Sequence, residues 1–348
     1  MFLPTLKERV DHFFRQHNLS RHANPFMIFK TVLFLSLAAA LYVVIITSIL
    51  PMLLQLGAAV LLGMTLAFIG FNICHDALHG AYSSNQKVNR SLGFVFNVIG
   101  ANAYLWNLTH NKVHHSYTNI VHHDEDIEIA PGLIRVHETD KANKLQRYQH
   151  IYAFFLYSLT MLAWVFRKDY LKFFQKSIGD SHVNQHPKSE YFKLFLYKGI
   201  YYFLFIVLPL LVMSLTWWQF LIGFVALHLA EGLVLGLVFQ LAHVVEDTEI
   251  CQAQDNTMDD AWAVHQLKTT ANFAPTSRIA NFLCGGLNLQ VEHHLFPKVC
   301  HVHYRRLSAI VKQTADEFNL PYHVNRSFYS ALRSHYLLLK RLGRPIHN

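Results

Sequence analysis

The chain has 348 residues, of which 52% are hydrophobic and only 15% are charged, well below the roughly 25% charged residues of ordinary soluble domains. The net charge of +8 could suggest a nucleic-acid partner, but the cations lie only in 7–30, 87–198 and 268–344. Such blocks, separated by long cation-free stretches, exclude a nucleic-acid-binding surface and indicate a membrane protein.

The first predicted elements are a cytosolic amphipathic segment over 1–30 and four apolar runs inside the cation-free windows. Each run has about 20 residues or more, enough to cross a hydrocarbon core of ~30 Å. Pro51 separates the first two runs, and Trp217-Trp218 mark the turn between the other two. Two hairpins follow, and the positive-inside rule places both termini and the middle loop in the cytoplasm. The predicted spans are about 31–50, 52–71, 199–218 and 219–242.

Two shorter apolar segments, about 92–108 and 151–166, carry cations at both ends. If both crossed the membrane, the second of the histidine clusters described below would face the opposite side from the others. We therefore expect interfacial helices. A cytosolic helical cap over 268–345, with an amphipathic helix at 303–318, completes one domain of 31–345. The predicted fold class is an all-α integral membrane protein with four transmembrane helices, interfacial helices and this cap.

Three short histidine clusters follow the apolar segments at their cytosolic ends. Residues four apart share one face of a helix. His75 with His79 can therefore hold one ion, and His110 with His114 another. Imidazole suits iron, zinc, copper and nickel, and seven rings are too many for one tetrahedral zinc site. Two irons in a shared nitrogen cage would use them all. The clusters are His75 and His79; His110, His114 and His115; and His293 and His294.

Further polar residues near these clusters are candidates for the same site. His243 ends the fourth predicted span, which favours an eighth imidazole ligand over a structural histidine. Gln290 opens the third cluster and could ligate through its amide oxygen or hold a water. Six acidic residues could accept hydrogen bonds from ligand rings, although a solvated loop is an equal interpretation for each: Asp76, Asp124, Asp126, Glu246, Asp247 and Glu292.

Other histidines lack the spacing of metal ligands. His228 and Glu231 lie one turn apart inside the fourth predicted span, where ionisable residues are costly. His228 precedes His243 by about 22 Å of helix, so we expect a polar contact between helices rather than ligation. Histidines 301, 303, 323 and 335 are expected at the surface.

The clusters, with the stretch from Gly286 to Pro297 that contains Gln290-Val-Glu-His-His, closely resemble the membrane fatty acid desaturase family. Glutamine at the start of the third cluster, and Leu320-Pro-Tyr-His323, are similar to its front-end branch, which includes linoleoyl-coenzyme A desaturases. The resemblance implies a non-haem centre of two iron ions. It also implies O2 as co-substrate and a cis double bond introduced into an acyl-coenzyme A, an acyl-carrier protein or an acyl-lipid. The implied ligands are the seven clustered histidines and His243.

Many front-end relatives carry a fused cytochrome b5 domain with His-Pro-Gly-Gly, whereas the one His-Pro here is His186-Pro187. A separate electron donor is therefore expected, a ferredoxin or a cytochrome b5-like protein with its reductase. The compact form resembles bacterial members, which places the chain in the inner membrane. Two alternatives stay open: a lipid hydroxylase of the same superfamily, and, more remotely, a metal transporter, although transporters hold their ligands at mid-membrane.

Overall fold

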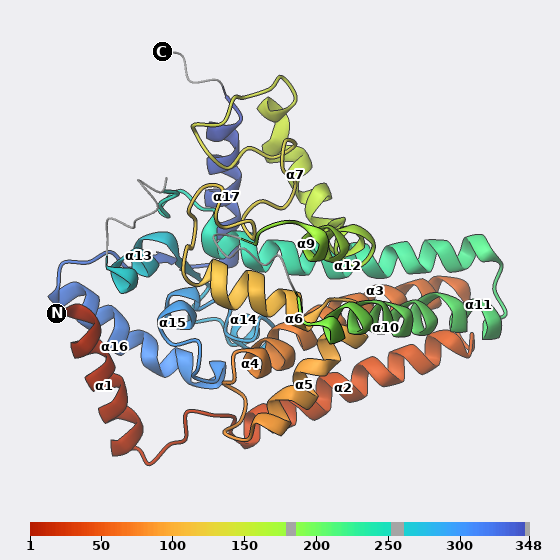
Figure 1. Cartoon of the computed structure of the whole chain (residues 1–348), viewed down its shortest axis with the longest axis horizontal. Helices are drawn as coiled ribbons and strands as arrows, with labels where there is room; N and C mark the ends of the chain where they lie inside the picture. Colours follow the sequence, from red (N-terminus) through yellow and green to blue (C-terminus); the bar gives the residue numbers. More distant parts are fainter. Residues whose placement is uncertain (179–185, 252–260, 345–348) are drawn as a thin grey trace.

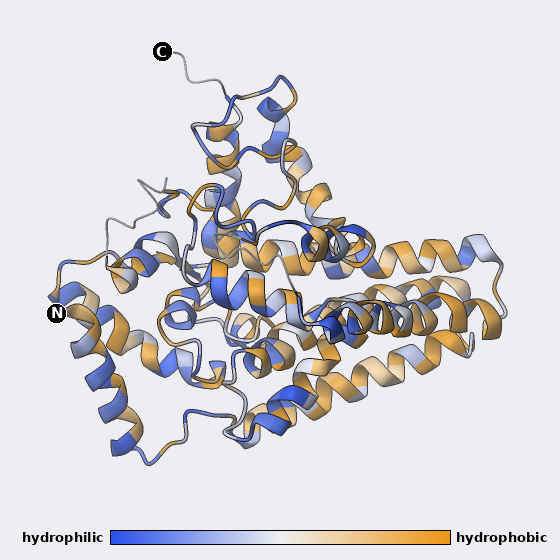
Figure 2. Cartoon of the chain, in the orientation of Figure 1, coloured by the Kyte–Doolittle hydropathy of each residue, from blue (hydrophilic) through white to orange (hydrophobic). Residues whose placement is uncertain are grey.

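The computed structural model describes residues 1–178, 186–251 and 261–344, and most of its regular structure is helical. Four long helical segments lie together at one end of the molecule, on the right of Figure 1, and Figure 2 shows that they are largely hydrophobic. Each is long and apolar enough to cross a bilayer, so the chain is an integral membrane protein. The segments are α2 (Pro25–Ile46), α3 (Met52–Ile69) with its continuation to Leu78, α10 (Lys188–Tyr202) with its continuation to Val212, and α12 (Trp217–His243).

The first span begins six residues earlier than predicted. The Asn24 side chain accepts a hydrogen bond from the Met27 backbone N–H (3.0 Å), and Pro25 occupies the first turn, a favourable start for a helix. Lys30, taken in the prediction to lie outside the span, is buried within it and donates to His301 Nε2 at 2.9 Å.

The predicted third span, 199–218, is wrong at both ends. The helix runs from Lys188 through a π-helical segment, η5 (Phe203–Val207), into α11 (Leu208–Val212). Lys198 lies inside it because its ammonium group pairs with buried Asp169 and donates to Gly100 O, each at 2.7 Å. A paired charge can be buried at a depth where an isolated one cannot.

The expectation of a single helix over 92–108 is also wrong. Helix α5 (Gln86–Val98) ends before Gly100, whose φ of +108° suits glycine, and Asn102 caps α6 (Ala103–Trp106). The chain then continues as the π-helical η2 (Asn107–His114). A Cβ atom on Gly100 would lie 2.8 Å from the Tyr201 ring, so the break also lets this loop approach the third span.

The second predicted interfacial segment, 151–166, is part of a longer helical run that bends by 58°. The bend follows Ser158, where α12 comes so close that a Cβ on Gly232 would lie 2.4 Å from Ser158 O. The run consists of η3 (Gln146–Tyr148), α7 (Gln149–Ser158), α8 (Thr160–Ala163), η4 (Trp164–Lys168) and α9 (Asp169–Phe174).

The rest of the chain forms a polar half opposite the long helices (Figure 2). The amphipathic α1 (Phe2–Gln16) packs its buried face against α16 (Tyr304–Glu317), the helix expected at 303–318. A two-stranded parallel sheet, with Ala271 opposite His323, and an isolated β-bridge between Ile120 and Cys251 depart from the predicted all-α structure. Residue 345, the predicted end of the cap, lies outside the described residues. The remaining elements are η1 (Gly70–Cys74), α4 (His75–Leu78), α13 (Trp262–Thr269), β1 (Ala271–Phe273), α14 (Arg278–Leu283), α15 (Gln290–Leu295), η6 (His301–His303), β2 (His323–Asn325) and α17 (Phe328–Leu342).

Candidate metal centre

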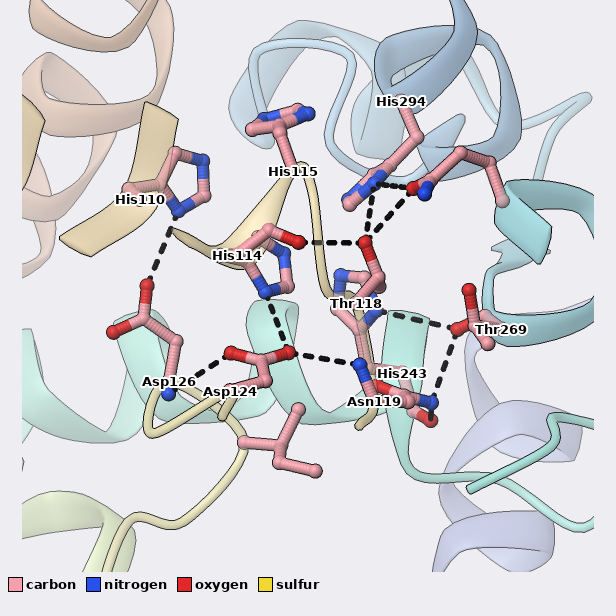
Figure 3. A network of polar contacts seen from close by, with 12 residues as sticks. His110, His114, His115, Thr118, Asn119, Asp124, Asp126, His243, Thr269 and His294 are labelled. Carbon is pink, nitrogen blue, oxygen red and sulfur yellow. Dashed lines mark hydrogen bonds and ion pairs between the residues drawn. The ribbon is translucent and has the colours of Figure 1, made fainter. Parts of the chain in front are cut away.

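The histidine clusters lie at the ends of elements that converge where the long helices meet the polar half. Helix α3 continues through η1 into α4, which begins at His75. The second cluster closes η2, the third lies on α15, and His243 is the last residue of α12. Figure 3 shows His110, His114, His115, His243 and His294 projecting into one region from these elements. π-Helical turns inside helices are frequent at functional sites, and two of the three clusters follow or contain one.

All eight histidines enter groups that could hold a metal ion, with ligand atoms within 4.8 Å of one another. Three groups overlap because His293 and His294 are each shared by two of them. One is His75, His79, His110 and His293; another is His114, His243 and His294; the third is His115, His293 and His294.

His110 and His114 belong to different groups, contrary to the expectation that they share one ion. Their rings are stacked with centroids 4.9 Å apart, and a different carboxylate holds each ring. His110 Nδ1 donates to Asp126 (3.3 Å), whereas His114 Nδ1 donates to Asp124 (2.8 Å). The Nε2 atoms of His110 and His114 therefore belong to two neighbouring candidate metal positions.

The unpaired ring nitrogens are the most informative feature of the site. In the described part of the chain, the Nε2 atom of every clustered histidine is buried without a hydrogen-bond partner. One unsatisfied buried polar group costs about 1–3 kcal/mol, so seven together call for a common ligand. Metal ions fit, because they bind the lone pair of neutral imidazole. The seven residues are His75, His79, His110, His114, His115, His293 and His294.

In five of the eight rings, those of His110, His114, His243, His293 and His294, the opposite nitrogen is held in place by a hydrogen-bond acceptor. Asp124 also accepts from the backbone N–H groups of Asn119 (2.9 Å) and Asp126 (3.1 Å), so this loop is tied to the ligand rings (Figure 3). Such contacts fix the tautomer and orientation of ligand imidazoles. Three further acceptors, which no sequence pattern indicated, are Gln266 Oε1 for His294 (2.6 Å), Tyr304 Oη for His293 (3.3 Å) and Thr269 O for His243 (3.4 Å).

The other predicted carboxylates are not hydrogen-bonded to a clustered histidine within the described residues, although Asp76 Oδ1 lies 4.0 Å from His75 Nδ1. Asp76 accepts from His301 Nδ1 at 2.8 Å, and His301 in turn accepts from Lys30. Glu292 accepts from Asn272 (2.8 Å) and Tyr322 (2.6 Å), and so ties α15 to β1. Glu246 and Asp247 are exposed, and within the described ranges neither is bonded to a clustered histidine, so we do not retain them as partners of the ligands.

The expectation that four histidines lie at the surface is wrong for three of them. His301, His303 and His335 are buried, and His323 is partly buried in β2. Each of the three bonds a distant segment: His301 bonds Asp76, His303 bonds His22 O (3.1 Å), and His335 bonds Tyr157 (2.8 Å) and Val244 O (2.6 Å).

Burial favours the neutral form of most of the imidazole rings in the site. It lowers the pKa of His110 to about 3, and it lowers the pKa values of His115, His293 and His294 well below the usual range, with the neighbouring imidazoles adding to the effect. At His114 burial also acts to lower the pKa, but the neighbouring carboxylates of Asp124 and Asp126 together outweigh it, so the pKa is raised. Since neutral imidazole is the form that binds metal, the pocket favours the metal-binding state of most of its rings.

Gln290 lies beside the group formed by His114, His243 and His294. Its Nε2 donates to His243 Nε2 at 2.9 Å, and its buried Oε1 has no hydrogen-bond partner in the described structure. The amide is therefore within reach of the metal-binding nitrogens, as its place in the third cluster suggests.

A largely apolar cavity of about 140 Å³ leads away from the histidines into the helical bundle. His75, His110 and Gln290 line it at the metal end. Its other walls come from α3 and η1, from α5 and α6, from α12 and from the bent run. They include Trp106, Phe71, Phe96, Met161, Leu235 and Phe239. The arrangement can bring an apolar chain directly to the metal-binding nitrogens.

Comparison with known proteins gives a consistent result over nearly the whole chain. Residues 50–326 match the family described as fatty acid desaturase. The chain is 35% identical over 347 residues to a sn-1 linoleoyl-lipid 6-desaturase of Synechocystis sp., covering 99% of this chain and 96% of that protein. It is 33% identical over 342 residues to the enzyme of the same name from Arthrospira platensis (98% and 92%), and 35% identical over 343 residues to an acyl-lipid (8-3)-desaturase of Physcomitrium patens (98% and 72%).

The family match covers all three histidine clusters and the cavity that begins at them, and the relatives align with both halves of the molecule. The protein therefore belongs to the fatty acid desaturase family and is an oxidoreductase that acts on fatty acyl chains.

Proposed function

We propose that this desaturase is a front-end enzyme that introduces a cis double bond into the acyl chain of a lipid, between an existing double bond and the carboxyl end. The observation that carries the desaturase chemistry is the set of seven buried Nε2 atoms without partners at the end of a largely apolar cavity. The front-end position is supported by Gln290 at the start of the third cluster and by the relatives named as 6- and (8-3)-desaturases. The relatives named for linoleoyl-lipid substrates support an acyl-lipid over a coenzyme A ester or an acyl-carrier protein.

The histidine groups divide naturally between two iron ions. One would be held by His75, His79, His110 and His293, and the other by His114, His115, His243 and His294. Gln290 adds an amide oxygen or holds a water beside the second group. Bound there, the irons supply the oxygen chemistry that an unactivated carbon–hydrogen bond requires, with O2 as co-substrate.

The protein's own contribution is to bind and orient the chain. The apolar walls of the cavity exclude water from the acyl chain, and the methylene groups beside His75 and His110 are the ones that react. Asp124 and Asp126 keep the ligand rings in one tautomer and one orientation.

The placement in the membrane follows from the four spans. We propose two hairpins with both termini and the histidines on the cytoplasmic side of a bacterial inner membrane, and the polar half as a cytosolic cap. Ile151 and Phe155, one turn apart on α7, are 62% and 61% exposed. Arg147 precedes them, so this bent run is suited to lie in the headgroup region. Electrons come from a separate donor, a ferredoxin or a cytochrome b5-like protein with its reductase.

Expression of the chain with such a donor in a host that lacks front-end desaturation tests this function. After feeding of saturated, mono-unsaturated and di-unsaturated acids, mass spectrometry locates the new double bonds in the extracted lipids. We expect the new bond on the carboxyl side of an existing one, and only when the donor is present. Products desaturated only on the methyl side, or only from saturated chains, would contradict the front-end assignment, and hydroxylated products would favour the hydroxylase alternative.

A further inference from the structure

Two cavities lie end to end between α3 and α12. The metal-side cavity, described above, contacts Leu66 on α3 and Glu231 and Leu235 on α12. The distal cavity, of about 150 Å³, contacts Leu62 on α3 and Leu227 on α12. On both helices the lining changes from one cavity to the other within about one turn, so a thin partition separates them.

A close helix crossing and a buried polar pair lie at the level of this partition. A Cβ atom on Gly63 would lie 2.0 Å from Leu227 O, so the backbones of α3 and α12 are in contact there. Beside this crossing, the Tyr201 hydroxyl donates to His228 Nε2, and His228 Nδ1 donates to Phe224 O at 2.7 Å. This confirms the expected polar contact between helices for His228. It does not account for the carboxyl group of Glu231, one turn further along α12.

Glu231 is 1% exposed, and within the described residues its Oε2 atom has no hydrogen-bond partner. It lies one turn from His228, on the side of the metal-side cavity. Thr160 lines the same cavity, and its buried Oγ1 is also without a partner in the described structure. A carboxyl group is costly at this depth, so a purely structural wall would use an apolar side chain. The end of the cavity that lies farthest along α12 from His243 is thus polar, in addition to the polar residues at its metal end.

We propose that Glu231 sets the upper limit on the length of acyl chain that the enzyme desaturates. The inference rests on the proposed function, because it takes the metal-side cavity as the acyl site. A methyl end that stops short of Glu231 leaves the carboxyl able to be solvated. A longer chain presses an apolar group against this carboxyl and desolvates it. The backbone contact between α3 and α12 at Gly63 keeps the chain from passing between these two helices.

Glu231→Leu tests the proposal in the full chain with its electron donor. The substrates are a graded series of acyl chains that differ only in their length beyond the reacting carbon, supplied in competition. We expect the ratio of long-chain to short-chain product to rise about tenfold, which corresponds to about 1.4 kcal/mol. Glu231→Gln, which keeps a polar group at the end of the cavity, should leave the ratio near that of the unmodified enzyme.

Thr65→Val is the matched control, since it also removes a buried polar group from a span. Its hydroxyl is already bonded to Leu61 O (2.7 Å), and it lines neither cavity. An active Glu231→Leu enzyme with an unchanged ratio, or an equal shift in Thr65→Val, would overturn the proposal. Loss of folded protein in both Glu231→Leu and Glu231→Met would also overturn it, because the carboxyl would then have a structural role. Failure of the unmodified enzyme to desaturate any chain would count against the proposed function instead.

Discussion

Replacing His114 or His294 with alanine is expected to abolish desaturation and to lower the iron content of the purified protein. The Nε2 atoms of both rings are buried and unpartnered, and both rings belong to the group that contains His243. Removing even an outer partner of a metal ligand costs about 10–100-fold in affinity or activity, so removing a ligand should cost more. Iron per chain, measured by atomic spectroscopy, and product formed in membranes are the two readouts.

His335→Ala is the matched control for these variants. His335 is just as buried, but both of its ring nitrogens are already bonded, to Tyr157 and to Val244 O. Its loss should lower the thermal stability while iron remains bound. Full activity with full iron content in either ligand variant would contradict the ligand assignment, as would equal loss of iron from His335→Ala.

His243→Ala and His228→Ala are expected to have different effects, on iron binding and on stability respectively, although both residues lie on α12. His243 ends the helix beside His114, with ring centroids 4.7 Å apart, whereas His228 lies four turns earlier and bonds Tyr201. The first variant should lose iron and activity. The second should keep its iron and lose about 1–3 kcal/mol of stability, because the Tyr201 hydroxyl is left without its acceptor.

Iron content and thermal unfolding of the two purified variants, measured in the same detergent, separate these effects. Loss of iron from His228→Ala together with retention of iron in His243→Ala would show that α12 does not place these residues as described. Changed chain-length selectivity in His228→Ala is compatible with its place in the partition.

The parts of the site that could be predicted depend on local spacing. Histidines four apart, and their positions after long apolar runs, are enough to predict that the three clusters gather at one end of four spans. The boundaries of two spans were missed because long-range contacts decide them. Lys198 enters the membrane half through its pair with Asp169, and Lys30 through its bond to His301, and neither partner is close in sequence.

Long-range contacts also explain why the hydrogen-bond partners of the ligand histidines could not be predicted from the sequence. Gln266 and Tyr304 hold ligand histidines, but each lies in a segment with no distinguishing pattern. The break at Gly100 was hidden inside an apolar run, since a run of hydrophobic residues does not show where a left-handed residue and a capping Asn102 end one helix and begin another. The partition at Gly63 depends on how closely two helices cross, which hydropathy does not describe.

If the eight histidines hold a pair of irons, the metal content of the purified, unmodified protein will show it. Elemental analysis combined with Mössbauer spectroscopy of iron-57-enriched protein reports both the number of irons and their ligands. We expect two non-haem irons per chain in nitrogen-rich environments, both diminished in His293→Ala, whose ring is shared between two of the groups. One iron per chain, or zinc in its place in an active preparation, would contradict this expectation.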